Sequence, residues 1–111
     1  MRYYIIAGEA SGDLHASNLV REMNALDPGV EFRGWGGDLM SAQGVRLVRH
    51  FREVAFMGFA EVATHLGTIS KALKQCKSDI LQYRPDAVIL VDYPGFNLRI
   101  ARFCHENGIR V

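Results

Sequence analysis

The chain alternates between short apolar runs and longer amphipathic segments. Residues 2–7 and 87–91 are apolar runs that predict buried strands. Residues 30–35 predict another strand, and residues 45–48 a shorter one. Because the run over 87–91 is unbroken, we expect it to form a central parallel strand covered on both faces.

The clearest helix lies before that run. Apolar residues recur at spacings of three and four, which is typical of one apolar helical face. They are Phe59, Val62, Leu66, Ile69, Leu73, Cys76, Ile80 and Tyr83. Residues 84–86 should end this helix, since the residue before Pro85 resists helical geometry.

Three other helices are predicted from their caps and stops. After the first strand, Ser11 should cap a helix that ends at residues 27–29. Its expected apolar face consists of Leu19, Val20, Met23 and Leu26. A short helix over 38–43 should stop at Gly44. The last helix should be capped by Asn97 and closed by Gly108.

This alternation predicts an α/β fold, a Rossmann-like doubly wound parallel sheet with right-handed crossovers. Residues 109–111 should begin a fifth strand. Since a mean strand has about five residues, we expect the chain to be truncated there and to belong to a larger protein.

Composition and net charge exclude several classes of function for this chain. A chain of 111 residues with 49% hydrophobic residues fits one domain, and a net charge of +1 gives no basis for nucleic-acid binding. Cys76 and Cys104 lie far apart and should be reduced core residues. The histidines lack metal-ligand spacing, so no metal site is expected. No apolar run approaches the ~20 residues of a membrane span, so any membrane contact should be peripheral.

Candidate chemistry gathers where the predicted strands end. The first strand leads into Gly8-Glu9-Ala10-Ser11-Gly12-Asp13, and the second into Gly34-Trp35-Gly36-Gly37. The strand over 87–91 is followed directly by Asp92. In an open α/β sheet these carboxyl ends border the ligand crevice.

Each of these features also has a purely structural interpretation. Asp13 would complement a helix dipole, and Glu9 would be solvated. Asp92 would serve a turn, and Trp35 would lie on the surface. In the functional alternative, Glu9 and Asp13 bind sugar hydroxyls, Asp92 faces the ligand and the Trp35 indole stacks on a sugar ring.

The segment Phe56-Met57-Gly58-Phe59 precedes the long helix and is apolar on every side. Contiguous Phe56, Met57 and Phe59 predict either core packing or an exposed patch for lipid or a partner.

Four ordered motifs resemble the lipid-A-disaccharide synthase family, glycosyltransferase family 19, across essentially the whole chain. They are residues 8–13, residues 34–40, Met57-Gly58 with Glu61-Val62, and Asp92-Tyr93-Pro94-Gly95-Phe96-Asn97.

The resemblance implies the acceptor-side N-terminal domain of an inverting GT-B glycosyltransferase. Such an enzyme transfers 2,3-diacylglucosamine from its UDP derivative to 2,3-diacylglucosamine 1-phosphate, forming a β-1,6 linkage and releasing UDP. It works on the inner face of the cytoplasmic membrane and needs no metal or other cofactor. The C-terminal nucleotide-sugar domain would lie outside this chain, which alone should be inactive. Whether the enzyme forms a homo-oligomer is left open.

By the same resemblance, Asp92 is the general base, and Phe56 and Phe59 contact acyl chains or the membrane. Where the family often has a second acid this chain has Gly95, which receives no role. The substrate-binding set implied is Gly8, Glu9, Ser11, Gly12, Asp13, Gly36, Gly37, Met57, Gly58, Glu61 and Asn97.

A function of another class also fits the residues alone. A non-catalytic Rossmann-like module that binds a nucleotide or a partner protein would need the same fold and the same glycine loops.

Overall fold

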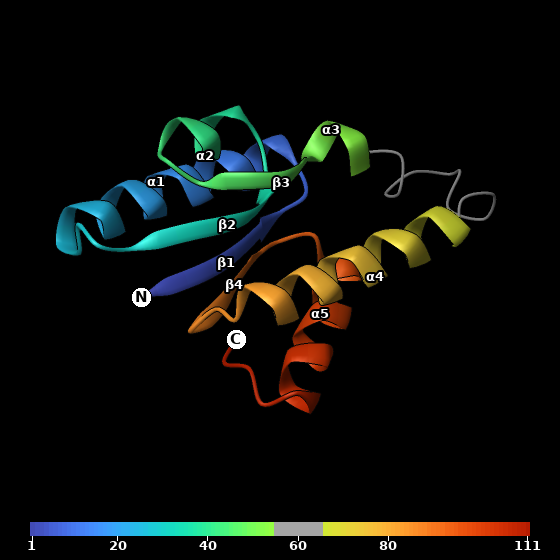
Figure 1. Cartoon of the computed structure of the whole chain (residues 1–111). Coiled ribbons are helices and arrows are strands. Elements are labelled where there is room, and N and C mark those ends of the chain that lie inside the picture. Colours follow the sequence, from blue (N-terminus) through green and yellow to red (C-terminus); the bar gives the residue numbers. More distant parts are fainter. Residues whose placement is uncertain (55–65) are drawn as a thin grey trace.

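A computed structural model describes residues 1–54 and 66–111. Within these ranges four parallel strands form one sheet in the order β3-β2-β1-β4 (Figure 1). The strands are β1 (Arg2–Ala7), β2 (Glu31–Gly36), β3 (Arg46–His50) and β4 (Ala87–Val91). The helices are α1 (Ala10–Leu26), α2 (Asp38–Ala42), α3 (Phe51–Val54), α4 (Leu66–Tyr83) and α5 (Pro94–Glu106).

Helices cover both faces of the sheet, which confirms the predicted Rossmann-like α/β architecture. Successive side chains of β1 point to opposite faces. Ile5 and Ala7 belong to the core cluster beneath α1 and α2, whereas Tyr4 and Ile6 belong to the cluster beneath α4 and α5. The free, fully buried Cys76 and Cys104 lie in the second cluster, as expected.

The prediction that residues 87–91 form a central strand is wrong for the described part of the chain. There β4 pairs with β1 alone, and β1 occupies the central position. Val88 is buried, but the other residues of β4 are only partly so. The Val88 N–H donates to the Arg110 carbonyl at 2.8 Å, although residues 109–111 form no assigned strand.

The two predicted side-chain caps are also wrong. Helix α1 begins at Ala10 with Glu9 at its N-cap position, so Ser11 lies inside the first turn. Helix α5 begins at Pro94, which places Asn97 within the helix. Proline suits the first helical position because its fixed φ is already helical and its missing N–H is not needed there.

The buried face of α1 differs from the predicted one. Leu19 and Leu26 are exposed, whereas Gly12, Ala16 and Val20 are buried. A Cβ built on Gly12 would lie 3.2 Å from the Ala7 Cβ, so the helix approaches β1 too closely for large side chains. Close packing onto the sheet therefore selects small residues over leucines.

A polar network joins β1, β2 and α4. The Arg33 guanidinium donates to both carboxylate oxygens of Asp79 at 2.8 Å. The Tyr4 hydroxyl donates to Asp79 at 2.8 Å and accepts from the Trp35 indole N–H at 3.0 Å. Burial would raise the pKa of Asp79, but hydrogen bonds from Arg33 and Tyr4 outweigh burial and lower it. The network fixes α4 against the sheet.

We expect Asp79→Asn to lower the free energy of unfolding at neutral pH by about 2 kcal/mol, because Arg33 loses its anionic partner. The pKa of Asp79 lies below its ordinary 3.8 in the folded state, so this stabilisation is present above that value and disappears as pH falls through the folded pKa. Urea unfolding at about pH 7 and about pH 3 measures both effects. The exposed Glu106→Gln, which removes an ion pair with Arg102, is the control. An equal loss at both pH values would contradict the network's role.

Candidate functional site

The carboxyl ends of the strands bring the predicted loops to one edge of the sheet, as the parallel topology requires (Figure 1). Gly8 follows β1, Gly37 follows β2, and Asp92 follows β4. A Cβ built on Gly8 would overlap the Tyr93 ring, so the first loop and the loop after β4 are in contact. The structure thus brings together segments far apart in the sequence.

Asp92 is exposed and sits on an unusual backbone. Both Asp92 and Tyr93 have left-handed φ values, of 50° and 52°. Each such residue costs of order 1–3 kcal/mol unless its surroundings stabilise it, and such strain is found disproportionately at functional sites. The bend directs the chain from the end of β4 into α5.

Asn97 stabilises this bend. Its side-chain amide donates to the Asp92 carbonyl at 2.8 Å and also reaches the Ile6 and Val91 carbonyls at 3.5 Å. The residue is 3% exposed, and its Oδ1 has no hydrogen-bond partner among the described residues. Asn97 therefore joins the ends of β1 and β4 directly beneath Asp92.

Tyr93 links the loop after β4 to the loop after β1. Its ring centroid lies 5.7 Å from that of Phe96, which holds the ring in place. Burial raises the pKa of Tyr93, and the negative charge of Glu9 adds to the increase. Glu9 is exposed and close enough to act on Tyr93 electrostatically. Tyr93, the residue after Asp92, therefore lies within electrostatic reach of Glu9.

Asp13 has a structural role. It is 3% exposed, and its carboxylate accepts from the backbone N–H groups of Gly37, Leu39 and Met40 at 2.9, 3.1 and 3.0 Å. These are the N-terminal N–H groups of α2, which need acceptors from outside the helix. The prediction that Asp13 complements its own helix dipole missed this long-range contact, because sequence spacing does not show which helix lies opposite.

The glycines of this edge make room for neighbouring atoms. A Cβ on Gly37 would overlap the Phe51 ring and lie 2.6 Å from the Asp13 carboxylate, and one on Gly36 would overlap the Met40 sulfur. Ser11 is exposed at the start of α1.

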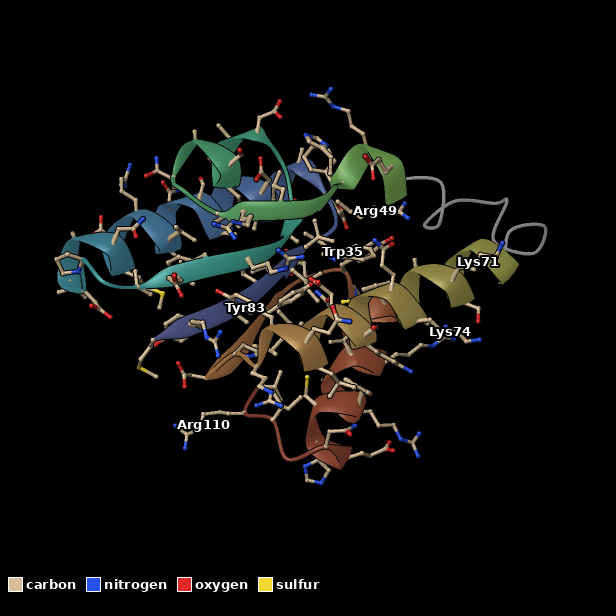
Figure 2. The ribbon with its side chains drawn as sticks, in the orientation of Figure 1. Trp35, Arg49, Lys71, Lys74, Tyr83 and Arg110 are labelled. Carbon is tan, nitrogen blue, oxygen red and sulfur yellow. The ribbon has the colours of Figure 1, made fainter. Side chains whose placement is uncertain are left out.

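Trp35 is neither on the surface nor available to a sugar, so both predictions for it are wrong. It is 2% exposed, and its ring lies 5.3 Å from that of Phe96 (Figure 2). Position 35 belongs to β2 rather than to the loop, so the period-two alternation places the side chain in the core.

A polar cluster after β3 was missed by sequence reasoning. His50 Nδ1 accepts from the Arg52 backbone N–H at 3.1 Å, so its Nε2 carries the hydrogen and donates to Asp38 at 3.0 Å. The Arg52 guanidinium donates to the same carboxylate at 3.1 Å. The strand predicted over 45–48 stops two residues short of His50, where β3 ends in the structure, so the sequence did not place His50 at this edge. Within residues 1–54 and 66–111, no group of three or more His, Cys, Asp or Glu could hold a metal ion.

Comparisons with known proteins identify the family of this chain. The sequence profile described as lipid-A-disaccharide synthetase matches residues 3–111. The chain belongs to the lipid-A-disaccharide synthetase family. This confirms the family resemblance drawn from the four motifs.

Individual relatives agree with the family match. Lipid-A-disaccharide synthase of Geobacter metallireducens is 47% identical over 110 residues, which are 99% of this chain and 29% of the relative. Lipid-A-disaccharide synthase of Geobacter sulfurreducens is 44% identical, again over 99% of this chain and 29% of the relative. That of Nitrosococcus oceani is 44% identical over 107 residues, 96% of this chain and 28% of the relative. The chain thus spans about 29% of the length of these relatives.

Several predicted site residues of the synthetase family lie outside the described residues. They are Phe56, Met57, Gly58, Phe59 and Glu61. In the described part of the chain, no helix has the length and apolar character needed to cross a bilayer.

We expect Asn97→Asp to lower the free energy of unfolding by about 2 kcal/mol, because a carboxylate would face the carbonyl oxygens to which the amide donates. Asn18→Asp makes the same chemical change at an exposed position of α1 and should have little effect. Urea unfolding of both variants measures the difference. If the two variants lose equal stability, Asn97 does not hold the bend.

Proposed function

We propose that the protein containing this chain is a lipid-A-disaccharide synthase. It would transfer 2,3-diacylglucosamine from its UDP derivative to 2,3-diacylglucosamine 1-phosphate, with inversion, in a GT-B architecture. This chain would supply the acceptor-side N-terminal domain. The observation that carries the proposal is the exposed Asp92 carboxylate, which stands on a left-handed bend at the end of β4 that the buried Asn97 holds.

Asp92 would act as the general base. The primary hydroxyl of the acceptor attacks the anomeric carbon of the donor and gives its proton to the carboxylate. The new carbon–oxygen bond forms as the bond to the diphosphate breaks, and UDP leaves with the electron pair. A positioned base typically accelerates such a step by about 10²–10⁴-fold. Anchorage at a strand end limits the motion of this carboxylate.

The other candidate residues divide by exposure. Glu9 and Ser11 are exposed and could hydrogen-bond sugar hydroxyls, which carboxylates and hydroxyls bind well. Gly8 allows the first loop to pack against Tyr93, and Asp13 and Asn97 are buried. We therefore assign Asp13 and Asn97 to positioning the site rather than to substrate contact. Gly12, Gly36 and Gly37 would give close backbone packing around it.

The substrates carry acyl chains, which supports a peripheral location on the inner face of the cytoplasmic membrane. Phe56 and Phe59 are the proposed acyl or membrane contacts, with Met57, Gly58 and Glu61 nearby in sequence. Because the chain spans about 29% of its relatives, UDP contacts would come from other parts of the protein, and this chain alone would be inactive.

In the full-length enzyme, Asp92→Asn should lower kcat by about 10²–10⁴-fold while KM changes little, because an amide cannot take the proton. The exposed Glu22→Gln on α1 removes one negative charge far from the edge and should keep full activity. Steady-state kinetics, with thermal unfolding to confirm an intact fold, measures this. Near-normal turnover by Asp92→Asn would remove Asp92 as the base.

The membrane proposal is tested by flotation of the full-length enzyme with liposomes. A Phe56→Ser/Phe59→Ser double variant should float less than the wild type, because two apolar anchors are lost. A matched Leu19→Ser/Leu26→Ser variant changes two exposed leucines of α1 and should float normally. Equal flotation of the phenylalanine variant and the wild type would rule out these residues as membrane contacts.

A further inference from the structure

A groove of about 430 Å³ lies at the opposite, amino-terminal edge of the sheet. Its charged wall consists of Arg2 at the start of β1, Glu31 and Arg33 at the start of β2, and Arg46 at the start of β3. Tyr83, the last residue of α4, lines the same groove (Figure 2). This volume is within the range of about 300–1,000 Å³ typical of small-molecule sites.

Strand register places two of the arginines side by side and the third beside Glu31. Arg2 is paired with Glu31, and Arg33 with Arg46, in the parallel ladders. Arg33 lies two residues before the core residue Trp35, so alternation places it on the face covered by α4. Like charges on paired strand positions repel each other, so the Arg33–Arg46 pair is unfavourable without a compensating anion.

Anionic partners within the fold do not pair with every arginine of this wall. Asp79 neutralises Arg33. The Arg2 guanidinium donates to the Arg84 carbonyl at 3.1 Å and lies 5.2 Å from the Tyr83 ring centroid, and neither of these two partners carries a charge. The carboxylate beside Arg2 is that of Asp86, which accepts the Arg2 backbone N–H at 2.8 Å. Among the described residues, Arg46 has no ion pair or side-chain hydrogen bond, and Glu31 has no ion pair.

Tyr83 shows that these charges converge. Burial raises the pKa of its hydroxyl, and the Glu31 carboxylate raises it further. Arg2, Arg33 and Arg46 act in the opposite direction. Charges at the starts of β1, β2 and β3 therefore act on one hydroxyl at the end of α4.

We propose that this groove binds a small soluble phosphate ester through the Arg2 and Arg46 guanidiniums. Guanidinium forks match the geometry of phosphate oxygens, and the Tyr83 hydroxyl can donate to a further oxygen. Glu31 disfavours a polyanion and can accept a hydrogen bond from a hydroxyl of the ester. A sugar monophosphate satisfies both conditions. The site lies at the edge of the sheet opposite Asp92, so it does not depend on the proposed transfer reaction.

The test is a titration of the purified protein with inorganic phosphate and with glucose 6-phosphate at constant ionic strength set by sodium chloride. Backbone amide NMR shifts of Arg33, Gly44 and Arg46 report occupancy of the groove. Both probes should bind saturably, and glucose 6-phosphate more tightly. Arg46→Gln should weaken binding at least about tenfold, as expected for lost charge-assisted hydrogen bonds.

The matched control is Arg110→Gln, which removes the same charge from an exposed residue that does not line the groove. It should bind both probes as the wild type does. Arg46→Lys keeps the charge without the fork and should bind with intermediate affinity. Shifts reproduced by chloride alone, or unchanged affinity in Arg46→Gln, would overturn the proposal. So would binding confined to phosphatidic acid vesicles, which would make the ligand a lipid headgroup.

Discussion

The carboxylate of Asp13 is the interaction on which the shape of the carboxyl edge depends. It leaves α1, crosses to the start of α2 and accepts backbone N–H groups there at 2.9–3.1 Å. A buried carboxylate is tolerated only when such donors surround it. Because the Asp13 carboxylate and the Phe51 ring both crowd the place that a Cβ would take, position 37 must be glycine. One side chain therefore sets the relation between the loops after β1, β2 and β3.

The opposite face has its own polar anchor. Asp79 on α4 binds Arg33 of β2 and Tyr4 of β1, so α4 is tied to both strands. With Asp13 on one face and Asp79 on the other, helices on both sides of β1 are fixed by carboxylates inside the fold. Two acids of the carboxyl edge, Glu9 and Asp92, are left exposed.

The strands and their α/β arrangement were predictable because they follow from local periodicity. Residues 2–7 and 87–91 were assigned correctly as strands, because short apolar runs bounded by turn residues are typical of buried strands. The position of β4 in the sheet was not, because strand order depends on contacts between distant segments. The buried face of α1 was predicted wrongly for the same reason. Close packing on Ala7 favours the small residues Gly12 and Ala16, which contribute little to a hydrophobic stripe in the sequence.

The location of the candidate site could be predicted from the sequence, but the roles of its individual residues could not. Parallel topology alone puts residues 8–13 and Asp92 on one edge, whereas His50 was missed because the predicted third strand ended at residue 48. Roles depend on burial, which the sequence does not report. Asp13 and Asp92 are both acids at the carboxyl edge, yet Asp13 is 3% exposed in the first turn of α1 with its oxygens bound by backbone donors, and Asp92 is exposed on a strained bend.

This contrast supports assigning the chemistry to Asp92. A base must exchange a proton with a substrate, so it needs an accessible oxygen and a position that does not drift. The oxygens of Asp13 meet the second requirement but not the first, and Glu9 meets the first from a loop. Asp92 combines exposure with a backbone held by Asn97, whose hydrogen bonds reach the ends of both β1 and β4. The acid best suited to chemistry is therefore the one whose backbone is held within the fold while its side chain is exposed.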